Sequence, residues 1–214
     1  MLKTKAVALC GLMLIALSCQ REQEAVAESD QTPTPAPTPN PDCSWCGATE
    51  APSDVSWTTQ IAPPSEPGER LSVTGTVYQS DGTTPAPDVT LYVYHTNIQG
   101  EYPKRGDETG NGVRHGYLRG WVKSDSKGRY QFDTIRPAPY PTHEGEPAHI
   151  HYTVLPKGGE EYWLSSAWFS DDPLVTDELV AGLDRVGGFP NVMEMSRDEN
   201  GVWHGVRNLV IEKY

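Results

Sequence analysis

Two histidines, His149 and His151, stand two residues apart in the segment Ala148–Tyr152. In an extended strand, side chains two residues apart point to the same face, so both imidazoles would share one face while Ile150 and Tyr152 point to the other. An apolar residue between the histidines suits a strand that packs one face on a core and turns the other into a cavity. Taken alone, however, this spacing is more typical of polar residues on a solvent face.

Two tyrosines upstream supply phenol groups. Tyr140 lies between Pro139 and Pro141, and such restricted backbone directs the phenol with little freedom. Tyr102 lies in a loop after the strand expected at 89–94. Two phenols and two imidazoles form an oxygen and nitrogen ligand set without thiolate, and phenolate stabilises ferric iron over softer or lower-valent metals. The candidate ligands for Fe(3+) are therefore Tyr102, Tyr140, His149 and His151.

The elements that must position these residues are short strands separated by turn signals. Alternating and β-branched runs predict strands at 71–78, 89–94, 121–123, 129–132, 149–155, 162–169 and 208–213. The turn residues Asp125–Gly128 predict that the segments 121–123 and 129–132 form a hairpin.

A helix is predicted only at Asp177–Val186, with Leu179, Leu183 and Val186 on one face and acidic residues in the first turn. The chain is therefore predicted to be all-β: a β-sandwich with long loops and one short helix.

The first residues have the pattern of an export signal. Lys3 and Lys5 precede the apolar run Ala6–Leu17, which is too short for a membrane-spanning helix, so residues 1–18 are predicted to be a signal peptide. The run ends in Ala16–Cys19, which resembles a bacterial lipoprotein box. We expect an exported lipoprotein that is anchored to a membrane of the cell envelope through acyl chains on Cys19. The alternative is an ordinary secreted protein cleaved nearby.

Between this signal and the domain lie two segments of different composition. Residues 19–42 are rich in proline and threonine and almost free of large apolar residues, which predicts an extended tether. Residues 43–66 contain Trp45, Trp57 and Ile61 among prolines and are expected to form an arm on the domain at 67–214. An exported compartment favours a local disulfide between Cys43 and Cys46, because two cysteines cannot complete a structural zinc site.

The charge balance excludes one class of partner. The chain has 17 Lys and Arg against 29 Asp and Glu, a formal net charge of −12, and no stretch gathers the basic residues that nucleic-acid binding requires. The acidity is interpreted as a solvated surface. Contact with a membrane is expected only through the lipid anchor.

Several motifs occur in one order over about residues 68–214: Leu118–Gly120, Gly128–Phe132, Pro139–Pro141 and Pro147–Tyr152. Together they resemble the intradiol ring-cleavage dioxygenases, such as those acting on protocatechuate and catechol. The resemblance implies that Tyr102 and Tyr140 are the family's two tyrosine ligands and that His149 and His151 are its two histidine ligands. It also implies a small aromatic diol as substrate, which is cleaved with dioxygen between its hydroxylated carbons. Tyr140 would leave the iron as a base when the diol binds.

One departure from the family pattern bears on turnover. Glu146 stands where the family usually has an arginine that stabilises negative charge on the ring. Losing one well-placed electrostatic donor costs about 100-fold or more in rate, so slow cleavage is expected, with carboxylated catechols repelled most. The arginines considered as substitutes are Arg114, Arg119 and Arg136.

Two other functions remain open from the sequence. One is a non-catalytic module of the transthyretin (prealbumin) type that binds carbohydrate or protein, which the residues Gly75, Val77 and Ser124–Phe132 also resemble. The dioxygenase core resembles the same β-sandwich, so these residues indicate the fold and do not distinguish the two functions. A further alternative is a protein that binds iron but has lost catalysis at Glu146.

The remaining histidines and tryptophans are assigned structural places. His95, His115, His143 and His204 are expected at the surface or in hydrogen bonds, with His115 and Tyr117 as candidates for the mouth of a pocket. The tryptophans Trp163, Trp168 and Trp203 are predicted to lie in the core.

Overall fold

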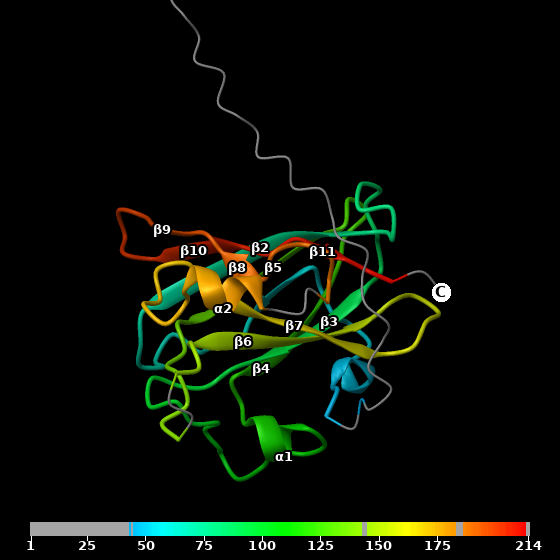
Figure 1. Ribbon diagram of the computed structural model, residues 1–214. Helices are drawn as coiled ribbons and strands as arrows, with labels where there is room; N and C mark the ends of the chain where they lie inside the picture. Colours follow the sequence, from blue (N-terminus) through cyan, green and yellow to red (C-terminus); the bar gives the residue numbers. More distant parts are fainter. Residues whose placement is uncertain (1–42, 44, 143–144, 183–185, 213–214) are drawn as a thin grey trace, which may run out of the picture. The chain divides into compact units, whose positions relative to one another are not determined.

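Two β-sheets stacked face to face form the body of the protein in the computed structural model (Figure 1). The structure describes residues 43, 45–142, 145–182 and 186–212. The predicted signal peptide, Cys19, the tether at 19–42 and His143 lie outside these residues.

Within the described residues, the first sheet has six strands, and β2 (Arg70–Tyr78) is its central strand. The order across this sheet is β1 (Thr58–Gln60), β5 (Arg129–Ile135), β2, β10 (Trp203–Val206) and β9 (Met195–Arg197), and β11 (Leu209–Val210) also pairs with β2. The second sheet has five strands in the order β4 (Arg119–Lys123), β3 (Thr90–Tyr94), β6 (His149–Leu155), β7 (Tyr162–Phe169) and β8 (Val192–Met193). The predicted β-sandwich is confirmed.

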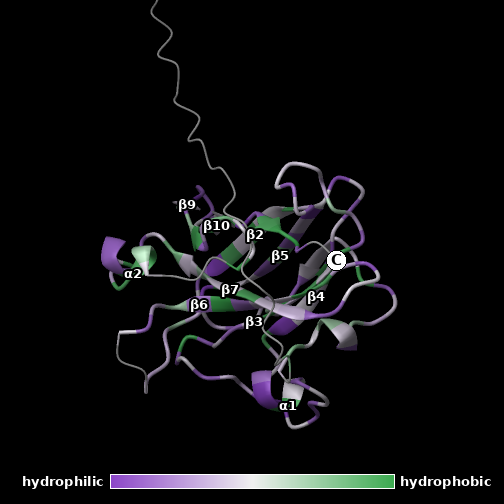
Figure 2. Ribbon diagram, turned by 45° about the vertical axis from the view of Figure 1, so that its right-hand side comes forward, coloured by the Kyte–Doolittle hydropathy of each residue, from purple (hydrophilic) through white to green (hydrophobic). Residues whose placement is uncertain are grey.

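The core lies between the sheets because one face of each strand is apolar. Val73 and Phe132 from the first sheet pack with Leu91, Ile150 and Tyr152 from the second, and all five are fully buried. Figure 2 shows the corresponding hydrophobic stretches within β2, β6 and β7. Since Ile150 and Tyr152 fill the core, the other face of β6 is left for the histidines.

The predicted hairpin at 121–132 is wrong. The turn forms as expected, with the Gly128 amide donating to the Asp125 carbonyl at 2.9 Å, but β4 and β5 belong to different sheets. Ser124 is buried at the end of β4, where its hydroxyl accepts from the Val89 amide at 2.9 Å and donates to the Ala86 carbonyl at 2.7 Å. These bonds tie β4 to the beginning of β3, so the turn carries the chain across the sandwich.

The helices are shorter than predicted, and one was missed. Helix α2 spans only Asp177–Ala181, with the Thr176 hydroxyl accepting from the Leu179 amide at its start. The predicted extension to Val186 is wrong, because Val186 instead exchanges two hydrogen bonds with Ser165 of β7. Leu183, assigned to the helix face, lies outside the described residues. The structure adds a one-turn helix, α1 (Gly112–His115), that the sequence analysis did not predict.

Among the described residues, no helix has the length and apolar character needed to cross a bilayer.

The arm packs on the sandwich through both polar and apolar contacts. The structure forms the disulfide between Cys43 and Cys46, and a 3₁₀ helix, η1 (Ala48–Glu50), follows it. The Glu161 carboxylate accepts hydrogen bonds from the backbone amides of Ala48 and Thr49 at the start of η1. Further along, β1 adds to the edge of β5 in parallel. The arm is therefore part of the folded domain.

Candidate metal centre

Strand β6 directs His149 and His151 to the face opposite the core. The backbone carbonyl of Pro147 accepts a hydrogen bond from His149 Nδ1 at 2.8 Å, so a neutral ring keeps its lone pair on Nε2. On the other ring, Nδ1 of His151 lies 3.1 Å from the Ser166 hydroxyl on β7. The two Nε2 atoms lie 3.0 Å apart, so both histidines present the same nitrogen to one point.

The two tyrosines come together because their loops are bonded to each other. The Thr96 hydroxyl donates to the Ala138 carbonyl at 2.6 Å, and the Ala138 amide donates to the Asn97 carbonyl at 3.1 Å. Gly100 has a φ of +77°, and a Cβ there would lie 2.1 Å from the Pro139 carbonyl oxygen. Only glycine therefore allows the Tyr102 loop to approach the Tyr140 loop this closely.

All four predicted ligand atoms converge. The phenol oxygen of Tyr140 lies 2.9 Å from Nε2 of His151 and forms a hydrogen bond with the phenol oxygen of Tyr102. Among the described residues, no three His, Cys, Asp or Glu side chains form a metal-binding group, so a metal here depends on the tyrosine oxygens. Two phenols and two imidazoles are hard donors of the kind that ferric iron takes. The residues present fit that ion.

The electrostatics of the centre favour neutral groups when no cation is bound. Burial, and then the neighbouring His149, hold the pKa of His151 well below its ordinary value. Burial raises the pKa of both tyrosines, and the carboxylate of Glu146 raises each of them further. The phenols therefore need a nearby cation before they ionise near neutral pH.

Glu146 lies beside the convergent nitrogens. Its Oε1 atom is 3.8 Å from Nε2 of His149, and its side chain is 41% exposed. The residue that departs from the family pattern thus contributes negative charge directly at the proposed ligands. Its charge therefore acts on the proposed metal ligands and not only on a bound substrate.

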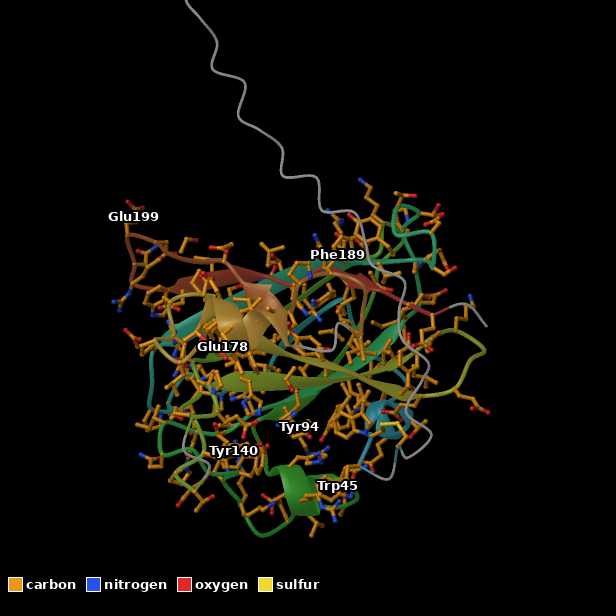
Figure 3. All side chains as sticks on the ribbon, viewed as in Figure 1. Trp45, Tyr94, Tyr140, Glu178, Phe189 and Glu199 are labelled. Carbon is orange, nitrogen blue, oxygen red and sulfur yellow. A yellow bond between two sulfur atoms is a disulfide. The ribbon has the colours of Figure 1, made fainter. Side chains whose placement is uncertain are left out.

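A cavity of about 320 Å³ opens next to the tyrosines and His151. Its lining residues are mainly aromatic: Trp45, Tyr94, Tyr102, Arg114, His115, Tyr140, His151 and Trp163. In Figure 3, the labelled Tyr94, Tyr140 and Trp45 lie below β6, on the side where α1 lies. The volume suits one small aromatic ring with substituents.

The sequence analysis missed several residues of this cavity. Tyr94 packs between two imidazoles, with ring centroids 3.7 Å from His115 and 4.5 Å from His151. The sequence held part of the signal, since alternation along the strand puts Tyr92 and Tyr94 on one face, but the pairing of Tyr94 with His151 in register comes only from the structure. Trp163, predicted to lie in the core, lines the cavity instead because it projects from β7 towards the outer face of the sheet.

The other histidines have the expected structural places. His95 is fully buried between the Thr96 carbonyl and the Thr134 hydroxyl, and His204 is exposed beside Asp198. His115 lines the cavity, as predicted for a residue at the mouth of a pocket. Tyr117 does not, since its hydroxyl donates to the Glu66 carboxylate at 2.8 Å and its ring packs beside another small core cluster.

Residues 44–199 match the model of a family described as Dioxygenase. A curated relative, the protocatechuate 3,4-dioxygenase beta chain of Burkholderia cepacia, is 30% identical over 130 residues, which cover 58% of this chain and 55% of the relative. The chlorocatechol 1,2-dioxygenase of Rhodococcus opacus is 29% identical over 133 residues, which cover 53% of this chain and 48% of that relative. The chain thus spans about half the length of the curated relatives it matches.

Solved structures share the fold at lower identity. The dioxygenase domain of a dioxygenase and carbohydrate-binding protein fusion from Streptomyces sp. SirexAA-E superimposes with a TM-score of 0.55 and 22% identity, covering 85% of this chain and 99% of that chain. The 3-chlorocatechol 1,2-dioxygenase of Rhodococcus opacus gives a TM-score of 0.57 and 20% identity, covering 86% of this chain and 72% of that chain.

Proposed function

Since the chain belongs to the intradiol ring-cleavage dioxygenase family, we propose that it is a ferric iron enzyme that cleaves a catechol-type ring with dioxygen. The proposed ligands are Tyr102, Tyr140, His149 and His151. The observation that carries the proposal is the convergence of their two phenol oxygens and two imidazole nitrogens beside an aromatic cavity. A plain binding module has no need of such a set.

In the proposed reaction, the bond between the two hydroxylated carbons breaks and both atoms of dioxygen enter the product as parts of two carboxyl groups. No further reductant is required. Bound ferric iron would supply a Lewis acid that stabilises the deprotonated form of the diol, whose ring is electron-rich enough to react with dioxygen.

The protein's own groups would move the protons and hold the ring. Tyr140 is the proposed base for a catechol hydroxyl, because its phenol oxygen lies at the cavity and within 2.9 Å of His151 Nε2. Tyr102 would stay in place and hold Tyr140 through the hydrogen bond between their phenol oxygens. Tyr94 and Trp163 form apolar walls that exclude water from the ring.

Iron loading and colour test the ligand set. The purified protein should carry about one iron per chain and absorb visible light by charge transfer from phenolate to iron. Tyr102→Phe and Tyr140→Phe should shift or weaken this band, whereas Tyr117→Phe, which removes a phenol outside the cavity, should not. His149→Ala should release the metal, and His204→Ala should retain it. A colourless protein that takes up zinc or no metal after ferric reconstitution would favour the plain module.

A second function, iron binding without turnover, is favoured by one observation: the Glu146 carboxylate lies 3.8 Å from His149 Nε2. Catechols should still perturb the charge-transfer band in such a protein. Oxygen uptake with a panel of catechols distinguishes the two functions. Uptake in the wild type supports the enzyme, and its absence from both the wild type and Glu146→Arg supports the inert iron protein.

We also propose that the enzyme is an exported lipoprotein held to a membrane through Cys19. This proposal depends on the export signal and the box-like sequence at Ala16–Cys19. The mature domain would then meet its substrate outside the cytoplasm.

A further inference from the structure

Three residues form the wall of the cavity next to α1, and none of them is a proposed iron ligand. Trp45 comes from the arm, and Arg114 and His115 come from α1. We call Trp45, Arg114 and His115 the α1 wall. Its members differ from the rest of the lining because they combine a cation, an N–H donor and an exposed aromatic face.

Within the described residues, the guanidinium of Arg114 is held by an aromatic ring and not through its hydrogen-bond donors. It stacks on the Trp45 ring at 3.7 Å from the ring centroid. Stacking engages the flat face of the guanidinium and leaves its N–H groups at the edge available for a planar anion. Among the described residues, no carboxylate forms an ion pair with Arg114 at the wall.

Trp45 can hold this cation because the arm is anchored around it. The disulfide joins Cys43 to Cys46 on either side of Trp45, and the Cys46 amide donates to the Cys43 carbonyl at 2.9 Å. Asn111, directly before α1, donates from its side chain to the Cys46 carbonyl. These contacts join the disulfide loop to the helix that carries Arg114.

His115 adds a second polar group that lacks a partner. The residue is only 2% exposed, and within the described part of the chain its Nε2 atom has no hydrogen-bond partner. Its Nδ1 atom lies 2.9 Å from the Tyr92 hydroxyl. When this hydroxyl donates to Nδ1, both groups are paired, and the hydrogen of a neutral imidazole is then on Nε2.

An unpaired buried N–H is unfavourable unless a ligand supplies an acceptor. The N–H of His115 and the N–H edge of Arg114 are both donors, and an oxygen-rich or anionic group in the cavity would accept hydrogen bonds from them. The carboxylate of Glu146, by contrast, lies beside His149, and the described residues that line the cavity do not include it. A ring substituent beside Arg114 would therefore meet positive charge, whereas a diol at the proposed ligands would lie on the side of the Glu146 carboxylate.

We propose that the α1 wall selects aromatic diols that carry an anionic substituent, with Arg114 and His115 as the specificity-determining residues and Trp45 as the support for Arg114. This inference rests on the proposed function for the orientation of the diol. It revises the expectation from Glu146 alone, which was that carboxylated catechols are repelled.

The test compares three probes that differ in one substituent: catechol, 3,4-dihydroxybenzoate and 3,4-dihydroxybenzamide. Binding is measured on the ferric protein through the charge-transfer band and on the apoprotein through tryptophan fluorescence. The wild type should bind the benzoate about tenfold more tightly than the benzamide. Arg114→Gln should abolish this preference for the benzoate over the benzamide, and Arg114→Lys should retain part of it.

Arg105→Gln is the matched control, because Arg105 also stacks on an aromatic ring, that of Tyr117, but does not line the cavity. His115→Phe keeps a ring beside Tyr94 and removes the N–H, so it should weaken binding of both carbonyl-bearing probes relative to catechol. Equal binding of benzoate and benzamide by the wild type, or an unchanged ratio in Arg114→Gln, would overturn the proposal. If no diol perturbs the band while the apoprotein still prefers the carboxylate, the proposed function fails and the α1 wall stands.

Discussion

Replacing Glu146 by glutamine should change iron affinity and turnover in opposite directions. The substitution keeps the shape of the side chain and removes one negative charge whose nearest oxygen lies 3.8 Å from Nε2 of His149. A ferric ion held by two phenolates retains one net positive charge, which the carboxylate attracts. The same carboxylate repels the electron density that develops on a bound diol.

The magnitude follows from the distance and the exposure. Two unit charges about 4 Å apart interact with about 1 kcal/mol in water and about 4 kcal/mol near a protein surface. Because the Glu146 side chain is 41% exposed, solvent screening keeps the interaction near the lower value, about 1–2 kcal/mol. Glu146→Gln should therefore weaken ferric binding about tenfold and raise the cleavage rate per bound iron by a similar factor.

Competition with a ferric chelator measures the affinity, and oxygen uptake normalised to bound iron measures the rate. The control is Glu199→Gln, which removes the same charge from an exposed loop well apart from Tyr140 in Figure 3. If Glu146→Gln and Glu199→Gln both match the wild type in affinity and in rate, the reasoning about Glu146 is refuted.

Three further predictions concern stability and location. Burial lowers the pKa of His95 from 6.5 to about 4, so the unfolded chain takes up a proton first, and the stability present above pH 6.5 is lost as the pH falls towards 4. In urea titrations, His95→Gln should reduce the loss of unfolding free energy between pH 7 and pH 4.5 by about 2–3 kcal/mol, and an equal loss in both proteins would contradict this. Gly47→Ala should lower the free energy of unfolding by about 1–3 kcal/mol, because the new Cβ would lie 2.6 Å from the Tyr92 ring. Gly182→Ala, which meets only ordinary contacts at 3.7 Å, should leave the melting temperature nearly unchanged, and similar melting of both variants would count against the packing argument. Cys19→Ser should move the protein from the membrane fraction to the soluble fraction without altering its visible spectrum, and an unmutated protein found wholly in the soluble fraction would exclude the anchor.

Local patterns were enough to predict the parts of the site that depend on one strand or one loop. The alternation around His149 and His151 is a property of extended backbone, and the observed strand β6 begins and ends where the pattern indicated. The prolines around Tyr140 likewise act on adjacent residues. The motif order added the expectation that Tyr102 joins them, and the structure brings its phenol into contact with that of Tyr140.

Contacts between distant segments decided the rest. The pattern at 121–132 specified a turn, but the bonds from Ser124 to Ala86 and Val89 assigned β4 to the other sheet. Trp45 and Arg114 are far apart in the chain, and they meet only because Glu161, Asn111 and the disulfide loop anchor the arm beside α1. Periodicity reports which face of an element is apolar, whereas the choice of neighbour depends on packing and on the pairing of buried polar groups over the whole chain. The sequence by itself therefore determined the candidate ligands and the class of fold, and the tertiary structure alone determined the cavity beside those ligands.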